Sequence, residues 1–176
     1  ILLMTNNAIT MEQINKLLQI QNEFDDRIPT KNVKDSTTAY IIEFFEWFNT
    51  IESFKNWKKN PGKPKETQLD ELSDMLAFGL SLVNQTNADL SELEEAINKL
   101  DEDQLDKDDY TSDTAMYGFM SDITHFDLGA NEALFLPIRI ANRVYTIEEL
   151  INAYLQKMQH NHQRQDGTAD KDKGYV

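Results

Sequence analysis

The sequence predicts an all-α protein, a bundle of helices without a sheet. Apolar residues recur at intervals of three or four, as on one face of a helix, most clearly at Leu69, Leu72, Leu76, Leu80 and Val83. The 176 residues include only 6 Gly and 4 Pro, the residues that interrupt helices most often. No segment alternates apolar and polar residues as a half-buried strand does.

The first two helices are placed by their end signals. The first is expected to start after a capping box, Thr10–Gln13, and to end near Ile28, because a proline follows. The second is expected to start at a cap formed by Asp35 and Ser36 and to run to about Trp57.

The rest of the chain is less uniform. A basic loop, 58–66, is predicted from its Gly and Pro, and a third helix from its apolar spacing at 68–85. The charge run "DEDQLDKDD" (101–109) is expected to be a solvated helix end or loop, while 113–136 fits a helix or irregular structure equally well. A second capping box, Thr146–Glu149, predicts the start of the last helix.

We expect one catalytic domain over residues 4–165, with 87–145 as a variable middle segment. The polar, Gly-containing stretch 166–176 is expected to be a mobile C-terminal tail that closes on the substrate.

Composition narrows the classes of function. The net charge of −14 argues against binding to nucleic acid, because phosphate backbones require a basic surface. The absence of cysteine excludes disulfides, thiolate metal sites and a cysteine nucleophile. No run of about 18 apolar residues is present, so we expect no membrane span and a cytoplasmic location.

Two acidic pairs stand in strongly apolar helices. "AYIIEFFEWFNTIESF" (39–54) is apolar on almost every side, as in a buried helix, yet it carries Glu43 and Glu46. Glu71 and Asp74 have the same spacing at the start of the apolar part of the third helix. Residues three apart share a helical face, and a short loop makes the two helices antiparallel neighbours, so the four carboxylates can converge.

Converging carboxylates repel one another, which raises their pKa values or attracts cations. Oxygen ligands without His or Cys suit Mg²⁺, which commonly binds carboxylates together with substrate phosphates. The alternative is a solvated helix face, but apolar surroundings on both helices make this interpretation weaker.

The arrangement Glu43-x-x-Glu46, a spacer of 24 residues (47–70) and Glu71-x-x-Asp74 resembles the all-α nucleoside triphosphate pyrophosphohydrolases. Three further segments resemble the dimeric dUTPases of bacteriophages within that superfamily. They are "LQIQNEFDDRIPT" (18–30), "FKNWKK" (54–59) and the ending Tyr154-x-x-Lys157-x-x-x-Asn161-x-x-Arg164-Gln165 with Gly174-Tyr175. The resemblance covers about 10–85 and 146–176.

The resemblance implies a Mg²⁺-dependent dUTP pyrophosphatase that forms dUMP and pyrophosphate, with dUDP as a further substrate. Glu43, Glu46, Glu71 and Asp74 would bind two or three Mg²⁺ ions, and Glu46 or Glu43 would accept a proton from the attacking water. The β-phosphorus is the implied point of attack. The substrate-binding residues implied in the same way are Gln21, Asn22, Asp25, Trp57, Lys58, Tyr154, Lys157, Asn161, Arg164, Lys171, Lys173 and Tyr175.

Some positions depart from the pattern or have a simpler explanation. Asp25 and Met158 stand where the resemblance predicts asparagine. Trp57 fits a stacking role or a core position. His160 and His162 are two residues apart and do not share a helical face, which argues against a metal pair.

Three other functions remain open at this point. A related house-cleaning pyrophosphohydrolase with another base preference would share the metal site. A protein-binding role, such as engaging a repressor of mobile genetic islands, would use the acidic middle segment. A purely structural bundle would not explain the acidic pairs. The resemblance also implies a homodimer, and the host cytoplasm as its location if a phage encodes the chain.

Overall fold

A computed structural model describes residues 8–100, 113–124 and 129–176. Within these ranges it has helices and no strand, which confirms the all-α prediction. The elements are α1 (Met11–Asp25), α2 (Val33–Ile51), α3 (Lys65–Thr86), α4 (Ser91–Asn98), α5 (Asp113–Thr124), α6 (Ala130–Val144), α7 (Ile147–Gln165) and a short 3-10 helix, η3 (Lys171–Lys173).

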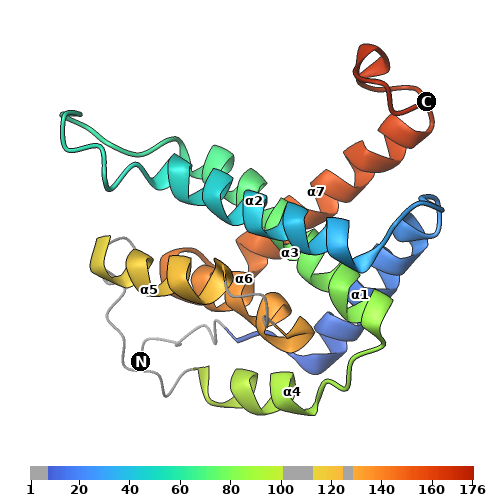
Figure 1. The fold of residues 1–176 in the computed structure, drawn as a ribbon, viewed down its shortest axis with the longest axis horizontal. Coiled ribbons are helices and arrows are strands. Elements are labelled where there is room, and N and C mark those ends of the chain that lie inside the picture. Colours follow the sequence, from blue (N-terminus) through green and yellow to red (C-terminus); the bar gives the residue numbers. More distant parts are fainter. Residues whose placement is uncertain (1–7, 101–112, 125–128) are drawn as a thin grey trace, which may run out of the picture.

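Helix α3 lies at the centre of the bundle. It packs against α1, α2, α6 and α7, and α2 runs beside it in the antiparallel direction (Figure 1). Gly79 allows α6 to approach closely, because a Cβ atom there would lie 2.9 Å from the backbone oxygen of Ala133. This central position explains why α3 is buried on several sides. It also places the acidic pair of α3, Glu71 and Asp74, between α2 and α7.

Both predicted capping boxes are present. The Thr10 side chain accepts a hydrogen bond from the backbone N–H of Gln13, whose side chain bonds back to the Thr10 N–H. Thr146 and Glu149 make the same reciprocal pair at the start of α7. These bonds satisfy N–H groups that have no partner inside the helix.

The predicted ends of α2 were wrong at both termini. The cap is Asn32, whose side chain accepts from the Asp35 N–H, so the helix starts before Asp35. It ends at Ile51 rather than near Trp57, because Glu52 adopts a left-handed conformation with φ 59°. The chain then turns into an extended loop, which Figure 1 shows projecting beyond the paired helices α2 and α3.

The described parts of the middle segment, 87–145, contain α4, α5 and α6. The ambiguous stretch 113–136 divides into α5 and the start of α6, while the charge run 101–109 lies outside the described residues. No described helix is long and apolar enough to cross a lipid bilayer.

Candidate active site

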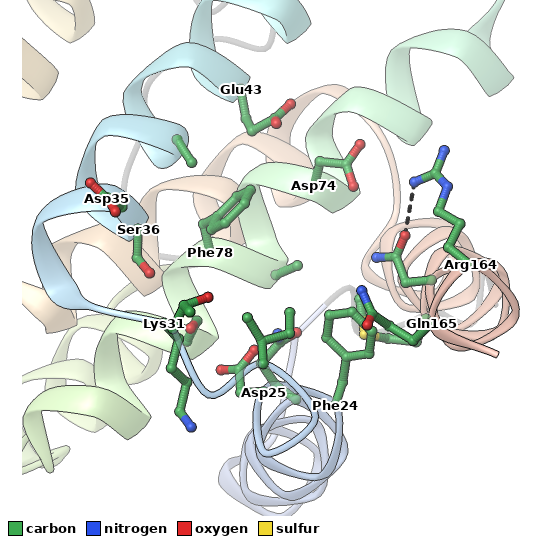
Figure 2. A pocket seen from close by; sticks show the side chains of 18 of the residues that line it. Phe24, Asp25, Lys31, Asp35, Ser36, Glu43, Asp74, Phe78, Arg164 and Gln165 are labelled. Atoms are coloured by element: carbon green, nitrogen blue, oxygen red, sulfur yellow. Dashed lines mark hydrogen bonds between the residues drawn. The ribbon is translucent and has the colours of Figure 1, made fainter. Parts of the chain in front are cut away.

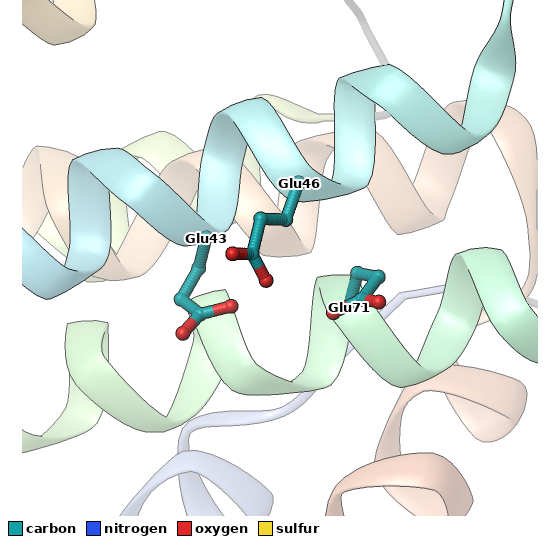
Figure 3. Close-up of side chains that lie close together, drawn as sticks. All are labelled: Glu43, Glu46 and Glu71. Atoms are coloured by element: carbon teal, nitrogen blue, oxygen red, sulfur yellow. The ribbon is translucent and has the colours of Figure 1, made fainter.

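The structure brings the predicted acidic residues together between α2 and α3. Glu43 and Glu46 on α2 point toward Glu71 on α3 (Figure 3), and each offers an oxygen within 4.8 Å of the others. Glu71 also belongs to a second trio with Asp70 and Asp74 that meets the same distance. The antiparallel packing of the two helices creates this convergence.

Three carboxyl groups of the cluster, those of Glu43, Glu71 and Asp74, have raised pKa values. Burial, followed by the charges of Asp74, Glu46 and Glu71, raises the pKa of Glu43 to about 8. Burial also raises the pKa values of Glu71 and Asp74. The Oε2 atom of Glu43 is buried and has no hydrogen-bond partner among the described residues. With all its carboxyl groups ionised, the cluster would carry more negative charge than the neighbouring protein groups compensate.

Lys157 is the cation that α7 contributes to the cluster. Its Nζ lies 2.7 Å from Asp74 Oδ2 and 2.9 Å from Asp70 Oδ2. Burial alone would lower the pKa of Lys157, but Asp74 and Asp70 outweigh it and raise the pKa above its usual value. Sequence reasoning missed Asp70, although its position four residues before Asp74 places it on the same helical face.

A pocket of about 490 Å³ opens beside the cluster, between α1, α2, α3 and the end of α7. In Figure 2, Glu43, Asp74 and Arg164 lie on one side of it, and Phe24 and Asp25 lie across from them on α1. Its size and mixed polar and apolar wall suit a small molecule. The predicted site residues that line it are Gln21, Asp25, Glu43, Asp74, Asn161, Arg164 and Tyr175.

Other predicted substrate-binding residues lie around or away from this pocket. Tyr154 is fully buried, and its hydroxyl donates to Gln21 Oε1 at 3.1 Å. Asn22 is exposed and faces Asp26. Trp57 is 72% exposed and does not line the pocket.

Lys58 is engaged elsewhere. Its Nζ lies 2.7 Å from both carboxylate oxygens of Glu52, a residue that is only 1% exposed. Lys55 and the backbone N–H of Gly62 bind the same carboxylate. Sequence reasoning did not single out Glu52, whose buried position follows from the tertiary fold.

The C-terminal tail folds back on Arg164. Its guanidinium Nε lies 2.6 Å from Asp170 Oδ2, and Nη1 donates to Asn161 Oδ1 at 3.0 Å. The ring of Tyr175 lies 5.1 Å from the guanidinium carbon. Lys173 lies 3.7 Å from Asp170, and Lys171 is exposed.

The two histidines of α7 have separate partners. His160 contacts Asp170 at 3.0 Å, and His162 contacts Arg27 at 2.9 Å. Arg27 also binds Asp166 at 2.6 Å and so links the end of α1 to the start of the tail. The two histidine side chains therefore contact different parts of the chain.

Several pocket residues were not predicted. They come from the end of α1 and the turn after it, from the start of α2 and from α3, and they are Phe24, Ile28, Thr30, Lys31, Asn32, Asp35, Ser36, Phe78 and Ser81. No motif marks them, because they meet only through the packing of α1 and α2 on α3.

This helical site can now be compared with known protein families. A family model described as dUTPase matches residues 13–168, which is most of the chain and includes the middle segment. The chain belongs to the all-α dUTPase family. It is a dUTP diphosphatase, a hydrolase that converts dUTP to dUMP and pyrophosphate. A search among curated proteins found no match.

Proposed function

We propose that this dUTPase acts at a Mg²⁺ site formed by Glu43, Glu46, Glu71 and Asp74, with two or three ions. The main support is that Glu43, Glu46 and Glu71 each offer a carboxylate oxygen within 4.8 Å of the others. In addition, Oε2 of Glu43 is buried without a hydrogen-bond partner among the described residues. An all-oxygen ligand set suits a hard divalent cation. When bound, Mg²⁺ neutralises charge on the cluster and the triphosphate and activates water as a nucleophile.

The protein groups have separate tasks in this mechanism. Glu46 or Glu43 accepts the proton of the water that attacks the β-phosphorus, and dUMP leaves as pyrophosphate is released. Lys157 and Arg164 stabilise negative charge on the phosphates, for which the planar guanidinium of Arg164 allows bidentate contact. The same arrangement would accept dUDP, because dUDP also carries a β-phosphorus, and attack there would release dUMP and inorganic phosphate.

The pocket suggests how the nucleotide is oriented. Glu43, Asp74 and Arg164 lie on one side, so the phosphates are placed there. The base then lies near Gln21 and Asp25 across the pocket. Asn161 contacts the sugar or a phosphate, Tyr154 supports Gln21, and Asn22 remains a candidate contact beside it.

The tail completes the phosphate side of the site in this proposal. Arg164 binds Asp170 in the structure, and a substrate phosphate would replace this carboxylate as its anion. Lys171 or Lys173 then supplies further positive charge, and Tyr175 covers Arg164. A tail that exchanges partners in this way is mobile.

We also propose that the enzyme is a homodimer. Ile42 is 50% exposed and Phe45 is 37% exposed on α2, which leaves apolar surface open on a helix whose other face is buried. Such surface is typical of an interaction site. Trp57 and Lys58 remain predicted substrate contacts, and Trp57 does not reach the pocket of its own chain.

Three further proposals concern the base preference, a protein partner and the location. The metal site would also serve a related nucleotide with another base, so base preference needs a direct test. A repressor of mobile genetic islands is a possible protein partner, and the host cytoplasm is the proposed location if a phage encodes the chain.

The test is phosphate release from dUTP, dTTP, dCTP, dATP and UTP with and without Mg²⁺. We expect a strong preference for dUTP and dependence on Mg²⁺. Glu46→Gln and Asp74→Asn should each lower kcat/KM by at least about 100-fold, because each removes a charge from the metal and proton-transfer site. Glu66→Gln, an exposed change in the first turn of α3, is the matched control. Full turnover in either cluster variant would contradict the assignment.

A further inference from the structure

Asp70 is an acidic residue at the edge of the cluster that belongs to neither predicted acidic pair. It lies on α3 immediately before Glu71, and its side chain is 58% exposed. Its Oδ2 atom lies 2.9 Å from the Nζ of Lys157, whose own side chain is only 10% exposed. Asp70 therefore reaches from the rim of the site to a shielded cation on α7.

Two carboxylates of α3 hold this ammonium. The second is Asp74, whose Oδ2 lies 2.7 Å from the same Nζ. Asp70 and Asp74 are four residues apart, so they lie on one helical face, one turn from each other. A lysine side chain is flexible, and an ammonium held by a single carboxylate can swing around it. Two contacts one turn apart fix the position of the Lys157 ammonium along α3.

The two carboxylates differ in their relation to the pocket. Asp74 lines it and is 22% exposed, whereas Asp70 does not line it. An oxygen of Asp70 lies within 4.8 Å of oxygens of Glu71 and Asp74, so direct binding of a metal ion is the alternative role for this residue. Its exposed position outside the pocket wall favours holding Lys157 from the far side.

We propose that Asp70 is a positioning residue, which keeps Lys157 in place to bind a substrate phosphate while Asp74 serves the metal site. This inference rests on the proposed function, which assigns these roles to Asp74 and Lys157. Once the charge of Asp74 is compensated there, its attraction for the ammonium weakens, and Asp70 remains as the anchor. An ammonium has three N–H donors, so one is left for a phosphate oxygen after the contacts with Asp70 and Asp74.

The experiment compares the steady-state kinetics of Asp70→Asn and the wild type at saturating Mg²⁺. We expect KM for dUTP to rise roughly 10-fold while kcat stays within about 3-fold, because a phosphate contact made in both the bound substrate and the transition state is weakened. Loss of charge alone predicts the opposite sign, since removing a negative charge near an anionic substrate leaves KM unchanged or lowers it.

Two further variants serve as controls on α3. Asp70→Glu keeps the negative charge at the same position, so its KM should stay within about 3-fold of the wild type. Glu66→Gln removes an exposed charge one turn earlier on the helix and should leave both kcat and KM unchanged.

Lys157→Met tests whether Asp70 acts through the lysine. We expect this substitution to raise KM for dUTP, and Asp70→Asn to raise it no further in the same background. A further rise in the double variant would contradict the proposed role. Asp70 is exposed, so Asp70→Asn should fold, and the sign of its own KM change decides the question if Lys157→Met does not fold.

Calorimetric titration with Mg²⁺ in the absence of nucleotide gives a readout that does not depend on turnover. Asp70→Asn should bind the same number of ions as the wild type, with an affinity within a few-fold, because Asp70 holds Lys157 and is not a ligand. Loss of an ion, or an affinity at least about 10-fold weaker, would assign Asp70 to the metal instead and overturn the inference.

The outcomes for the inference and for the proposed function can be told apart. An unchanged or lower KM in Asp70→Asn would reject the positioning role and leave the proposed function intact. A wild-type enzyme that binds no Mg²⁺, or hydrolyses dUTP equally well without it, would overturn the proposed function and this inference with it.

Discussion

Helix α2 and its cap carry two shielded glutamates with opposite electrostatics. The Oε2 atom of Glu43 is buried and has no hydrogen-bond partner among the described residues, and the pKa of Glu43 is raised to about 8. Glu52, nine residues later, is 1% exposed, and bonds from Lys58, Lys55 and Gly62 lower its pKa to about 2. Burial alone therefore does not mark a functional carboxylate. The difference is whether the protein itself supplies the compensating positive charge.

The negative charges of Glu52 and Glu43 are compensated in different ways. Glu52 uses the basic residues of its own loop, so its charge is neutralised when the chain folds. Glu43 faces Glu46, Glu71 and Asp74, and under the proposed function a cation from solution compensates its ionised form. A structural carboxylate and the proposed metal-binding carboxylate thus lie nine residues apart, one at the C-terminal cap of α2 and one on the helix.

The largest expected effect separates these roles by mutation. Glu43→Gln should lower kcat/KM for dUTP by at least about 100-fold, because it removes charge from the proposed metal and proton-transfer site. The same change should leave the metal-free protein at least as stable, because it relieves repulsion in the cluster. Steady-state kinetics and thermal unfolding in a chelator measure the two effects.

Glu52→Gln is the matched variant and should give the reverse result. It removes a charge that holds Lys55 and Lys58 together, so Tm should fall by several degrees. Its kcat/KM, measured well below Tm, should stay within a few-fold of the wild type. A large loss of activity in a folded Glu52→Gln protein would show that its loop takes part in the reaction.

The sequence was a good guide where a local pattern sets the structure. The spacing of Glu43 with Glu46, and of Glu71 with Asp74, places each pair on one helical face, and a short connection brings the faces together. The capping box at Thr146 likewise depends only on neighbouring residues. Such features need no knowledge of distant contacts.

The sequence failed where distant residues determine the result. Glu52 looked like one more residue of a continuing helix, but its carboxylate is buried against Lys58 and Gly62, and the helix ends there. The pocket wall, including Lys31 and Ser81, likewise joins parts of the chain that meet only in the fold. Side-chain periodicity does not contain that information.

An effect of intermediate size is expected for the metal-free protein, whose stability should depend on pH through Glu43. Between about pH 4.5 and 8, Glu43 keeps a proton in the folded state that it loses when unfolded, so stability falls as pH rises through this range. Glu71 and Asp74 contribute in the same direction. Tm in a chelator should drop by roughly 5 °C.

Glu52 predicts the opposite sign at the acid end. Its folded-state pKa of about 2 lies below its ordinary value of 4.5, so it stabilises the fold above pH 4.5 and this stabilisation is lost as pH falls toward 2. Adding Mg²⁺ should remove the high-pH loss but not the acid loss. In Glu43→Gln the high-pH slope should be reduced, and in Glu52→Gln the acid slope should be reduced. If neither substitution changed the dependence of stability on pH, the proposed difference between Glu43 and Glu52 would be contradicted.

The smallest expected effect concerns the loop that Glu52 holds. Trp57 is 72% exposed there, so Trp57→Ala should change Tm by no more than about 1 °C, as is usual for surface positions. The loop's stability would then depend on its buried carboxylate and not on its largest side chain. A raised KM for dUTP at unchanged Tm would support the stacking role that the resemblance implies, and an unchanged KM would remove Trp57 from the site. A marked fall in Tm would show that the indole is covered by another surface, for which the exposed side of α2 in a second copy is the first candidate.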